Sequence, residues 1–490
     1  MSANGLGPKI GETVERFDLE KAWLVDPVSG REGPGEIVVI DGVLESVTWL
    51  EGAEAAGVTD TGVVVAPGFF DLHAHFREPG FEDAETVATG SAAAAHGGYT
   101  TVALMPNTQP AIDEPGALSR IRSAAAASGS PVEVLAFGAV SAGRTGEQLS
   151  AMGELADAGV IGYSDDGAPV KTAKLMRSAL VYSGMLGLPI VEHAEDLELT
   201  SGAEAHEGYV ASVLGLAGWP TAAEVQAVSR DISLLSDALA DEPRARLHLT
   251  HVSTAAALDL VRRARAAGLP VTCDVTPHHL AFTDEWIAGS RRWAWEALDA
   301  SGAARDPWVD GVLTDGPYNT SLRVNPPLSA ASDAAACLAA LLDGTADAVA
   351  TDHAPHTVVD KEVEFGKASN GISGIETALG VLLSLVDAGK LPLARAIAAL
   401  TTGPAAVVAA STRTSGTSAA RPRGLTEGAP ADLVVFDRSD TWKVSQESLL
   451  SKGKNSPLIG RELPGRVLLT IAGGRLAYED PSADAGDSEA

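Results

Sequence analysis

Two histidines two positions apart form the part of the sequence best suited to chemistry. His73 and His75 end an apolar run, residues 69–75, that follows Pro67-Gly68 and that we expect to be a strand. Side chains at i and i+2 of a strand leave the same face, so both imidazoles point together, and Asp71 shares their face. Two imidazoles aimed at one point supply half of a site for zinc or a similar ion. A lone histidine on a strand is more often a hydrogen-bonded core residue, so the other ligands must come from elsewhere in the chain.

Runs rich in β-formers alternate with Ala/Leu-rich runs over residues 67–424. The former predict eight strands, at residues 69–75, 99–105, 132–138, 160–164, 189–193, 247–252, 271–275 and 346–352. The latter predict helices, among them residues 85–95, 116–128, 147–158, 173–183, 222–240 and 255–267. Eight strands alternating with helices favour an α/β fold of the parallel (β/α)8 TIM-type barrel class. A doubly wound open sheet is the alternative, but no glycine-rich dinucleotide fingerprint follows the early strands.

Strand-like runs at both ends of the chain predict a second, smaller structure. They lie at residues 21–25, 36–40 and 43–47, and again at residues 431–436, 467–471 and 475–478. Short strands with tight turns are typical of a small β-domain, which we expect the two ends to build together. The expected division is 1–66 for its N-terminal part, 67–424 for a metal-dependent barrel, and 425–490 for its C-terminal part plus a tail. Residues 411–423 are expected to form a flexible linker.

Composition excludes several classes of function. The 490 residues are 45% hydrophobic and 20% charged, as in ordinary globular proteins, and suit two or three domains or one large barrel with an appendage. A net charge of −30 argues against nucleic-acid partners and anionic membrane surfaces. Cys273 and Cys337 are the only cysteines, which excludes a disulfide framework and suits a reducing compartment. Because neither a signal peptide nor a spanning apolar run is seen, we expect a cytoplasmic protein without membrane contact.

Histidines gather at the ends of the predicted strands, where barrels of this type place their chemistry. Eight of the 11 histidines lie there: His73, His75, His193, His251, His278, His279, His353 and His356. Six side chains can converge: His73, His75, His193, His251, Asp352 and one of Asp165 and Asp166. That set suits two zinc ions bridged by a carboxylate, and zinc lowers the pKa of bound water to roughly 7. Two such cations would outweigh the carboxylates and attract an anionic substrate.

These residues stand in motifs through which the chain resembles the cyclic amidohydrolases and, within them, the type I dihydroorotases. The resemblance covers most of the chain. Its motifs are Pro67-Gly-Phe-Phe-Asp-Leu-His-Ala-His-Phe-Arg-Glu-Pro-Gly80, Gly97-Gly-Tyr-Thr-Thr-Val-Ala-Leu-Met-Pro-Asn-Thr108, Ser164-Asp-Asp-Gly167, Val191-Glu-His-Ala-Glu-Asp196, Val275-Thr-Pro-His-His-Leu280, Arg323-Val-Asn-Pro-Pro-Leu328, Ala350-Thr-Asp-His-Ala-Pro-His356 and Ser451-Lys-Gly-Lys-Asn-Ser-Pro457.

The resemblance implies a metal site and a substrate site. The implied ligands of two zinc ions are His73, His75, His193, His251 and Asp352, with Asp166 as the bridge. The implied substrate contacts are His75, Arg77, Asn107, Asn325 and His356, together with Asn370 and Gly371, which stand where the family has Phe-Gly. Hydantoinases and allantoinases carry a carboxylated lysine as the bridge. Lys171 is five residues past Asp166 and off the motif, so the aspartate separates this chain from those enzymes.

The resemblance also implies a reaction, the zinc-dependent interconversion of N-carbamoyl-L-aspartate and L-dihydroorotate in de novo pyrimidine (UMP) biosynthesis. Arg77 can grip the substrate carboxylate with two parallel hydrogen bonds. Asp352 is the expected catalytic residue, taking a proton from the attacking water and passing it to the leaving ring nitrogen. Partners expected on the same ground are a second copy of the chain, as a homodimer, and possible assembly with aspartate transcarbamoylase.

Two other functions remain open. One is a hydantoinase, dihydropyrimidinase or allantoinase on the same scaffold, against which Arg77 and Asn107 favour a substrate with a carboxylate. The other is an inactive homologue that supports aspartate transcarbamoylase, although all six expected ligands are kept. The Trp-rich residues 281–322 form a longer connection than the family has. They are expected to be a lid, an oligomer contact or a decoration with its own small core.

Overall fold

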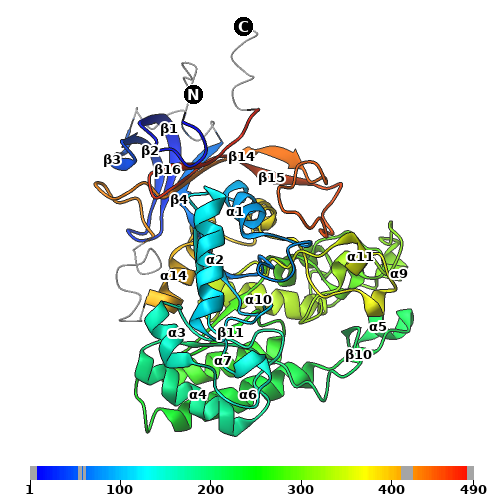
Figure 1. Cartoon of the computed structure of the whole chain (residues 1–490). Coiled ribbons are helices and arrows are strands. Elements are labelled where there is room, and N and C mark those ends of the chain that lie inside the picture. Colours follow the sequence, from blue (N-terminus) through cyan, green and yellow to red (C-terminus); the bar gives the residue numbers. More distant parts are fainter. Residues whose placement is uncertain (1–7, 53–57, 59–61, 410–422, 483–490) are drawn as a thin grey trace.

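The computed structural model describes residues 8–52, 58, 62–409 and 423–482 of the chain. The predicted linker at residues 411–423 lies almost wholly outside these ranges, as does the end of the predicted tail. Strands from the two chain ends lie together at one side of the molecule, and the helices surround the remaining strands on the other side (Figure 1).

A seven-stranded sheet combines both ends of the chain, in the order β16-β15-β14-β4-β1-β2-β3. Its strands are β1 (Arg16–Asp26), β2 (Arg31–Ile40), β3 (Val43–Trp49), β4 (Val63–Pro67), β14 (Leu433–Lys443), β15 (Glu462–Ala472) and β16 (Arg475–Glu479). Neighbours are antiparallel except β1 and β4, which are parallel. Alternate side chains of a strand share a face, so Leu24, Ile37, Val65, Val435 and Ile471 meet in one apolar cluster.

The chain leaves this sheet at β4 and enters the first parallel strand after a single glycine. A Cβ on Gly68 would lie 2.2 Å from Cγ2 of Thr100, so only glycine fits between the two strands. The backbone N–H of Phe69 then donates to the carbonyl of Gly98. The Pro-Gly that precedes the histidine pair therefore marks the step from one sheet into the next.

Parallel strands carry the histidine pair and the other expected ligands. One group is β5 (Phe69–Ala74), β6 (Tyr99–Leu104) and β7 (Glu133–Ala136), and another is β8 (Ile190–His193), β11 (Leu247–Thr250), β12 (Val271–Val275) and β13 (Ala348–Val349). Isolated parallel bridges join Gly138 to Tyr163 and Tyr163 to Ile190, and another joins Ala74 to His353. The strand predicted at residues 160–164 is thus reduced to one bridge residue, and that at 346–352 to two residues.

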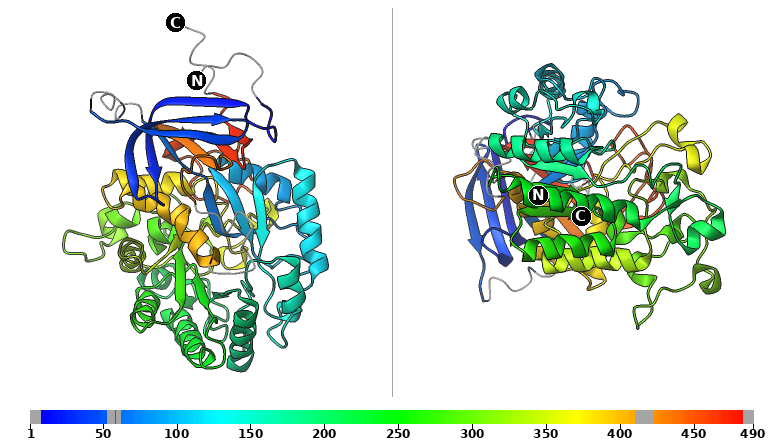
Figure 2. Two further views of the ribbon diagram at one scale, coloured as in Figure 1. Left: turned by 90° about the vertical axis from the view of Figure 1, so that its left-hand side faces the viewer. Right: turned by 90° about the horizontal axis from the view of Figure 1, so that it is seen from below.

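Helices pack around these strands (Figure 2). They are α1 (Val87–His96), α2 (Pro115–Ser128), α3 (Met152–Ala158), α4 (Ala173–Leu186), α6 (Thr221–Ala238), α7 (Ala255–Ala266), α10 (Ala331–Asp343), α12 (Ala378–Asp387), α13 (Leu393–Leu400) and α14 (Thr402–Ala409). Thr86, Thr172 and Thr254 cap α1, α4 and α7, each accepting a hydrogen bond from a backbone N–H of the first turn. The six helices predicted from sequence are present, and α3 begins five residues later than expected.

Shorter elements lie in the connections. They are α5 (Tyr209–Leu214), α8 (Pro277–Ala281), α9 (Pro307–Asp310), α11 (Val358–Lys361), β9 (Ala205–His206), β10 (Gly218–Trp219) and the 3-10 turns η1 (Ala142–Arg144), η2 (Asp284–Trp286), η3 (Ala294–Glu296), η4 (Thr320–Leu322) and η5 (Phe365–Lys367). Over the described ranges, no helix combines the length and the apolar character that crossing a membrane requires.

The long connection at residues 281–322 has a small apolar core of its own. Trp286 and Trp293 pack with Phe282, with ring centroids 4.3–6.0 Å apart. The guanidinium of Arg461 lies 3.7 Å from the centroid of the Trp293 ring. Leu458 and Leu463 belong to the same apolar cluster. Of the three roles expected for this segment, the structure contains the decoration with a core, closed by residues from the C-terminal part of the chain.

The packing of Trp286 predicts a large loss of stability on truncation. Its side chain is 0% exposed, so Trp286→Ala leaves a cavity and should cost roughly 3–5 kcal/mol of unfolding free energy. Trp308 in the same segment is only half-buried, with its ring 5.3 Å from that of Tyr209, so Trp308→Ala is the matched control with a smaller effect. Denaturant unfolding of both variants measures the difference, and equal losses would contradict this description of the core.

Candidate metal and substrate site

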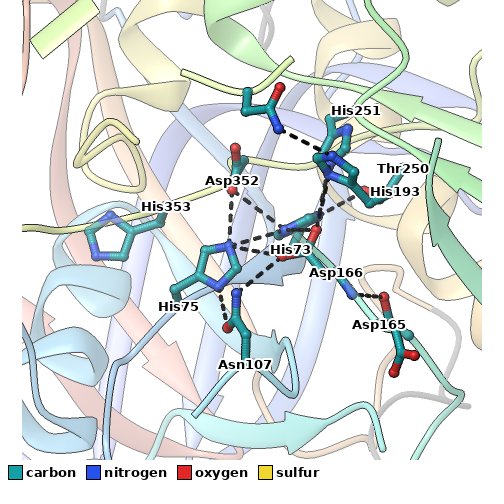
Figure 3. Close-up of polar contacts among 12 residues, drawn as sticks. His73, His75, Asn107, Asp165, Asp166, His193, Thr250, His251, Asp352 and His353 are labelled. Atoms are coloured by element: carbon teal, nitrogen blue, oxygen red, sulfur yellow. Dashed lines mark hydrogen bonds and ion pairs between the residues drawn. The ribbon is translucent and has the colours of Figure 1, made fainter. Parts of the chain in front are cut away.

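Six side chains from five places in the chain meet at the C-terminal ends of the parallel strands (Figure 3). His73 lies in β5, His75 directly follows it, and His193 ends β8. His251 directly follows β11. Asp166 and Asp352 come after the bridge at Tyr163 and after β13. All six side chains are buried.

Asp166 lies at the centre of the cluster. Its Oδ1 is 3.4 Å from Nε2 of His73, 3.5 Å from Nδ1 of His193 and 3.5 Å from Nε2 of His251. Its Oδ2 is 3.6 Å from Nε2 of His75. One carboxylate therefore faces all four imidazoles, with its two oxygens directed at different histidines. The predicted role of Asp166 as a bridge between two cations fits this position.

Asp352 closes the cluster on the side of the histidine pair. Its Oδ1 lies 3.1 Å from Nε2 of His75 and 3.5 Å from Nε2 of His73. The two Nε2 atoms are themselves 3.2 Å apart. The side chains form two triads, His73–His75–Asp352 and His73–Asp166–His251. Within each triad the three possible ligand atoms lie within 4.8 Å of one another.

Hydrogen bonds on the far sides of the rings fix which nitrogen faces the centre. Nδ1 of His75 lies 2.9 Å from Oδ1 of Asn107, and Nδ1 of His73 lies 2.8 Å from Oγ1 of Thr250. Nε2 of His193 lies 2.8 Å from Oε2 of Glu195. In its neutral form each ring donates its proton outward from the outer nitrogen, and the inner nitrogen then presents a lone pair to the centre. Three inward lone pairs beside two carboxylates form a donor set that fits a metal ion.

The histidines and carboxylates of the cluster shift one another's pKa values. Burial opposes ionisation of Asp166, but His73 and the hydrogen bonds from His193 and His251 hold its pKa well below the usual value. Burial also opposes protonation of His193, yet Asp166 and Glu195 raise its pKa to about 10. The pKa of Asp352 is lowered in the same way, chiefly by His73. Both carboxylates are therefore held in the charged form by the histidines around them.

A cavity of about 140 Å³ opens beside the cluster. Its walls include His75 and five further residues that were predicted to contact substrate, namely Arg77, Asn107, Asn325, Asn370 and Gly371. His356 stands behind Arg77, with its Nε2 3.2 Å from Nη2 of the arginine. The structure therefore brings every residue predicted for the substrate site to one place, next to the predicted ligands.

Arg77 is anchored so that its guanidinium stays in this cavity. Its Nε donates to the carbonyl of Pro355 over 3.0 Å. Its backbone is left-handed, with φ of 60°, a conformation uncommon outside glycine. Gly371 has φ of 143°, and a Cβ there would lie 2.5 Å from Cβ of Ala354. Glycine is therefore required at position 371, the second position of the expected Phe-Gly pair, and the chain keeps it. Asn370 takes the place of the phenylalanine.

Two predicted substrate residues also have partners inside the protein. Asn107 bonds His75 and donates from Nδ2 to Asp166 over 3.3 Å. Asn325 donates from Nδ2 to Glu195 over 2.8 Å. Both amides line the cavity, and Asn107 also orients two predicted ligands directly, whereas Asn325 acts on His193 through Glu195. Glu195 and Thr250, which hold His193 and His73, were missed in the sequence, although Glu195 stands two positions after His193 in its motif.

Three acidic or basic residues near the motifs lie outside the cluster. Asp165 accepts hydrogen bonds from the backbone N–H groups of residues 140 and 141, so the aspartate that joins the cluster is Asp166. Asp71, which the strand pattern places with the histidines, instead accepts from the backbone N–H of Thr351 over 2.9 Å. Lys171 is exposed, whereas the six side chains of the cluster are buried.

Comparisons with known proteins agree with this geometry. Residues 62–256 match the family model described as Dihydro-orotase-like. The chain is 44% identical to "Dihydroorotase" of Anaeromyxobacter dehalogenans, over 95% of this chain and 98% of that protein. It is 41% identical to "Dihydroorotase" of Pelotomaculum thermopropionicum, over 94% and 98%.

Solved structures show the same fold at lower identity. The L-hydantoinase (dihydropyrimidinase) from Arthrobacter aurescens matches with a TM-score of 0.73 and 23% identity, over 94% of this chain and 96% of that one. The D-hydantoinase (dihydropyrimidinase) from Thermus sp. matches with a TM-score of 0.69 and 22% identity, over 94% and 95%. Because the chain is 41–44% identical to dihydroorotases over nearly its whole length, it belongs to the dihydroorotase family of the amidohydrolase superfamily.

Proposed function

We propose that this protein is a dihydroorotase that interconverts N-carbamoyl-L-aspartate and L-dihydroorotate in de novo pyrimidine biosynthesis. The observation that carries the proposal is a buried cluster of four histidines and two aspartates beside a cavity that contains Arg77. The 44% identity to a dihydroorotase over 95% of the chain supports the same substrate. A cationic guanidinium suits a substrate that bears a carboxylate.

The proposal includes the architecture predicted from sequence. The parallel pairings and isolated bridges pass from β5 round to His353 and back to Ala74, which supports a closed (β/α)8 barrel. The mixed sheet supports a small β-domain made from both chain ends. The domains would then be residues 1–66 and 425–490 for this β-domain and residues 67–424 for the barrel.

The proposed cofactor is a pair of zinc ions. One would be held by His73, His75 and Asp352, and the other by His193 and His251, with Asp166 between them. Zinc at such a site lowers the pKa of water and polarises a carbonyl oxygen as a Lewis acid. Imidazole nitrogens and carboxylate oxygens are the ligands zinc takes in catalytic sites.

The residues of the chain bind the substrate and move one proton. Arg77, with Asn107, Asn325, His356, Asn370 and Gly371, holds the carboxylate end of the substrate in the cavity. In hydrolysis, water adds to the ring carbonyl carbon and the bond from that carbon to the ring nitrogen breaks. Asp352 takes the proton from the water and gives it to the nitrogen. Ring closure runs the same steps backwards and releases water.

A hydantoinase or dihydropyrimidinase activity is the second candidate, because the structural matches carry those names. Their identity is only 23% and 22%, so they indicate the fold and not the substrate. Asp166 in place of a carboxylated lysine and Arg77 in the cavity wall both favour the carboxylate-bearing ring.

A comparison of cyclic amides tests the proposed function. We expect the purified protein, with its metal content measured, to hydrolyse dihydroorotate far faster than dihydrouracil, hydantoin or allantoin. Arg77 has an ionic partner only in the first of these substrates. Faster turnover of dihydrouracil would instead assign the second candidate, and no turnover of any ring by metal-loaded protein would favour an inactive homologue.

Substitution of Asp352 should remove turnover without removing the fold. Asp352→Asn keeps the shape of the side chain but cannot accept the proton, so kcat should fall by roughly 10²–10⁴-fold. Asp347, before β13, bonds Arg265 and the backbone N–H of Cys273, so Asp347→Asn controls for loss of a carboxylate on the same stretch. Near-normal kcat in Asp352→Asn would exclude the acid–base role.

Substitution of Arg77 should weaken substrate binding with the metal content unchanged. Arg77→Lys keeps the charge but loses the planar pair of N–H donors, so KM for dihydroorotate should rise about 10-fold, equivalent to about 1.4 kcal/mol. Arg177→Ala removes a half-exposed arginine of α4 that pairs with Asp237 and Asp241 and serves as the control. Unchanged KM and kcat in Arg77→Lys would count against the carboxylate grip.

Assembly and location complete the proposal. A homodimer, a complex with aspartate transcarbamoylase and a cytoplasmic site of action stay predictions, since a single chain tests none of them. Light scattering of the purified protein, alone and mixed with aspartate transcarbamoylase, measures the first two.

A further inference from the structure

A segment near the C-terminal end of the chain is buried against the loops of the substrate site. Residues 451–457 form no helix or strand, yet Ser451, Gly453 and Asn455 are all buried. The side chain of Asn455 reaches His356, which lies 99 positions earlier in the sequence. An amide buried in a loop needs partners for all its polar atoms, so its contacts show what holds it there.

Asn455 uses its whole hydrogen-bonding capacity on the two loops that flank the cavity. Its Nδ2 donates to the carbonyls of Ala354, over 3.1 Å, and Gly371, over 2.9 Å. Its Oδ1 accepts from the backbone N–H of His356 over 2.8 Å and from Oγ of Ser373 over 2.9 Å. An asparagine side chain has two N–H donors and two acceptor lone pairs. All four are used, two on each loop.

The rest of the segment is fitted to the same loops. A Cβ on Gly453 would lie 2.6 Å from Cβ of Pro355 and 2.8 Å from the backbone nitrogen of His356. Oγ of Ser373 also lies 2.7 Å from the carbonyl oxygen of Gly453, so its single proton is shared between this oxygen and Oδ1 of Asn455. Glu85, which follows β5, accepts from the backbone N–H of residue 452 over 3.2 Å. The segment is thus held at its start and pressed against His356 at its middle.

These loops carry the proposed carboxylate grip. Arg77 depends on them twice, through the carbonyl of Pro355 at 3.0 Å and through the His356 ring at 3.2 Å. Gly371 and Asn370 line the cavity from the other loop. A shift of either loop would therefore move Arg77 and the cavity wall together, while the ligands on the strands keep their places.

We propose that Asn455 is a positioning residue that sets the substrate-carboxylate subsite by tying the loop of His356 to the loop of Gly371. The inference rests on the proposed function for the identity of the substrate, and on the structure alone for the tie. It assigns a role in substrate recognition to the C-terminal part of the chain, which supplies none of the proposed metal ligands.

Steady-state kinetics with dihydroorotate test the role. Asn455→Ala should raise KM about 10-fold, with metal content unchanged and kcat much less affected, because the subsite and not the reacting centre is disturbed. In a His356→Ala background the same change should raise KM less than about twofold, since residues that act through one another are not additive. Thr470→Val is the matched control, because it removes a buried hydrogen bond from β15, also in the C-terminal part of the chain, to the carbonyl of Ala95 and should leave KM unchanged.

Hydrogen–deuterium exchange tests the tie without any substrate. Asn455→Ala should speed exchange in peptides covering residues 354–357 and 371–374 but not in β5, and Thr470→Val should change neither loop. Should Asn455→Ala fail to fold, Asn455→Asp carries the same comparison, because it keeps the acceptor for His356 and loses both donors. Unchanged exchange, or additive effects on KM in the double variant, would overturn the inference. Wild-type protein that does not turn over dihydroorotate would overturn the proposed function instead, and the exchange data would still decide the tie.

Discussion

One carboxylate among four imidazoles is the contact on which the site depends. Asp166 is buried, and each of its neighbours His73, His75, His193 and His251 lies within 3.6 Å of one of its oxygens. An ion taken out of water costs several kcal/mol unless opposite charge compensates it. Protonated imidazoles supply that charge when no metal is bound, and metal ions supply more of it. The buried carboxylate of Asp166 is therefore stable only beside positive charge, so the strand ends must keep the four imidazoles close to it.

Much of this arrangement could be predicted from local patterns. The period of two along residues 69–75 directs His73 and His75 to one side, and the observed Nε2–Nε2 distance is 3.2 Å. The alternation of strands and helices then brings the distant residues His193, His251 and Asp352 to the same edge, because parallel strands end at the same edge of a sheet. Both predictions depend only on periodicity and chain direction, which a sequence displays directly.

The same periodicity failed for Asp71. It shares the predicted face with the histidines, but its carboxylate is bonded to Thr351 across the gap between β5 and the residues after β13. The residues predicted as the fourth strand pair only at Tyr163. Strand ends curve and twist, so a face assigned by counting holds for fewer residues than the apolar run suggests.

Contacts that join remote segments could not be predicted at all. Arg461 closes the aromatic core of residues 281–322, and Glu195 fixes the ring of His193. Neither contact has a periodic signal, because each depends on a side-chain rotamer and on how two separate segments dock. Motif membership indicates that such residues matter but not what they touch.

Backbone strain at the site links its geometry to the stability of the fold. His251 and Asp352 have φ of 42° and 47°, in the left-handed region that costs non-glycine residues about 1–3 kcal/mol each. Both are held there by neighbours. The backbone N–H of His251 donates to Asp274 over 2.6 Å, and that of His353 donates to Oγ1 of Thr351 over 3.0 Å. The strain is offset by hydrogen bonds and burial in the strands, so the ligand directions are set by the folded chain before any metal or substrate binds. The loops around Arg77 are fixed in the same way, by the carbonyl of Pro355 and by Asn455.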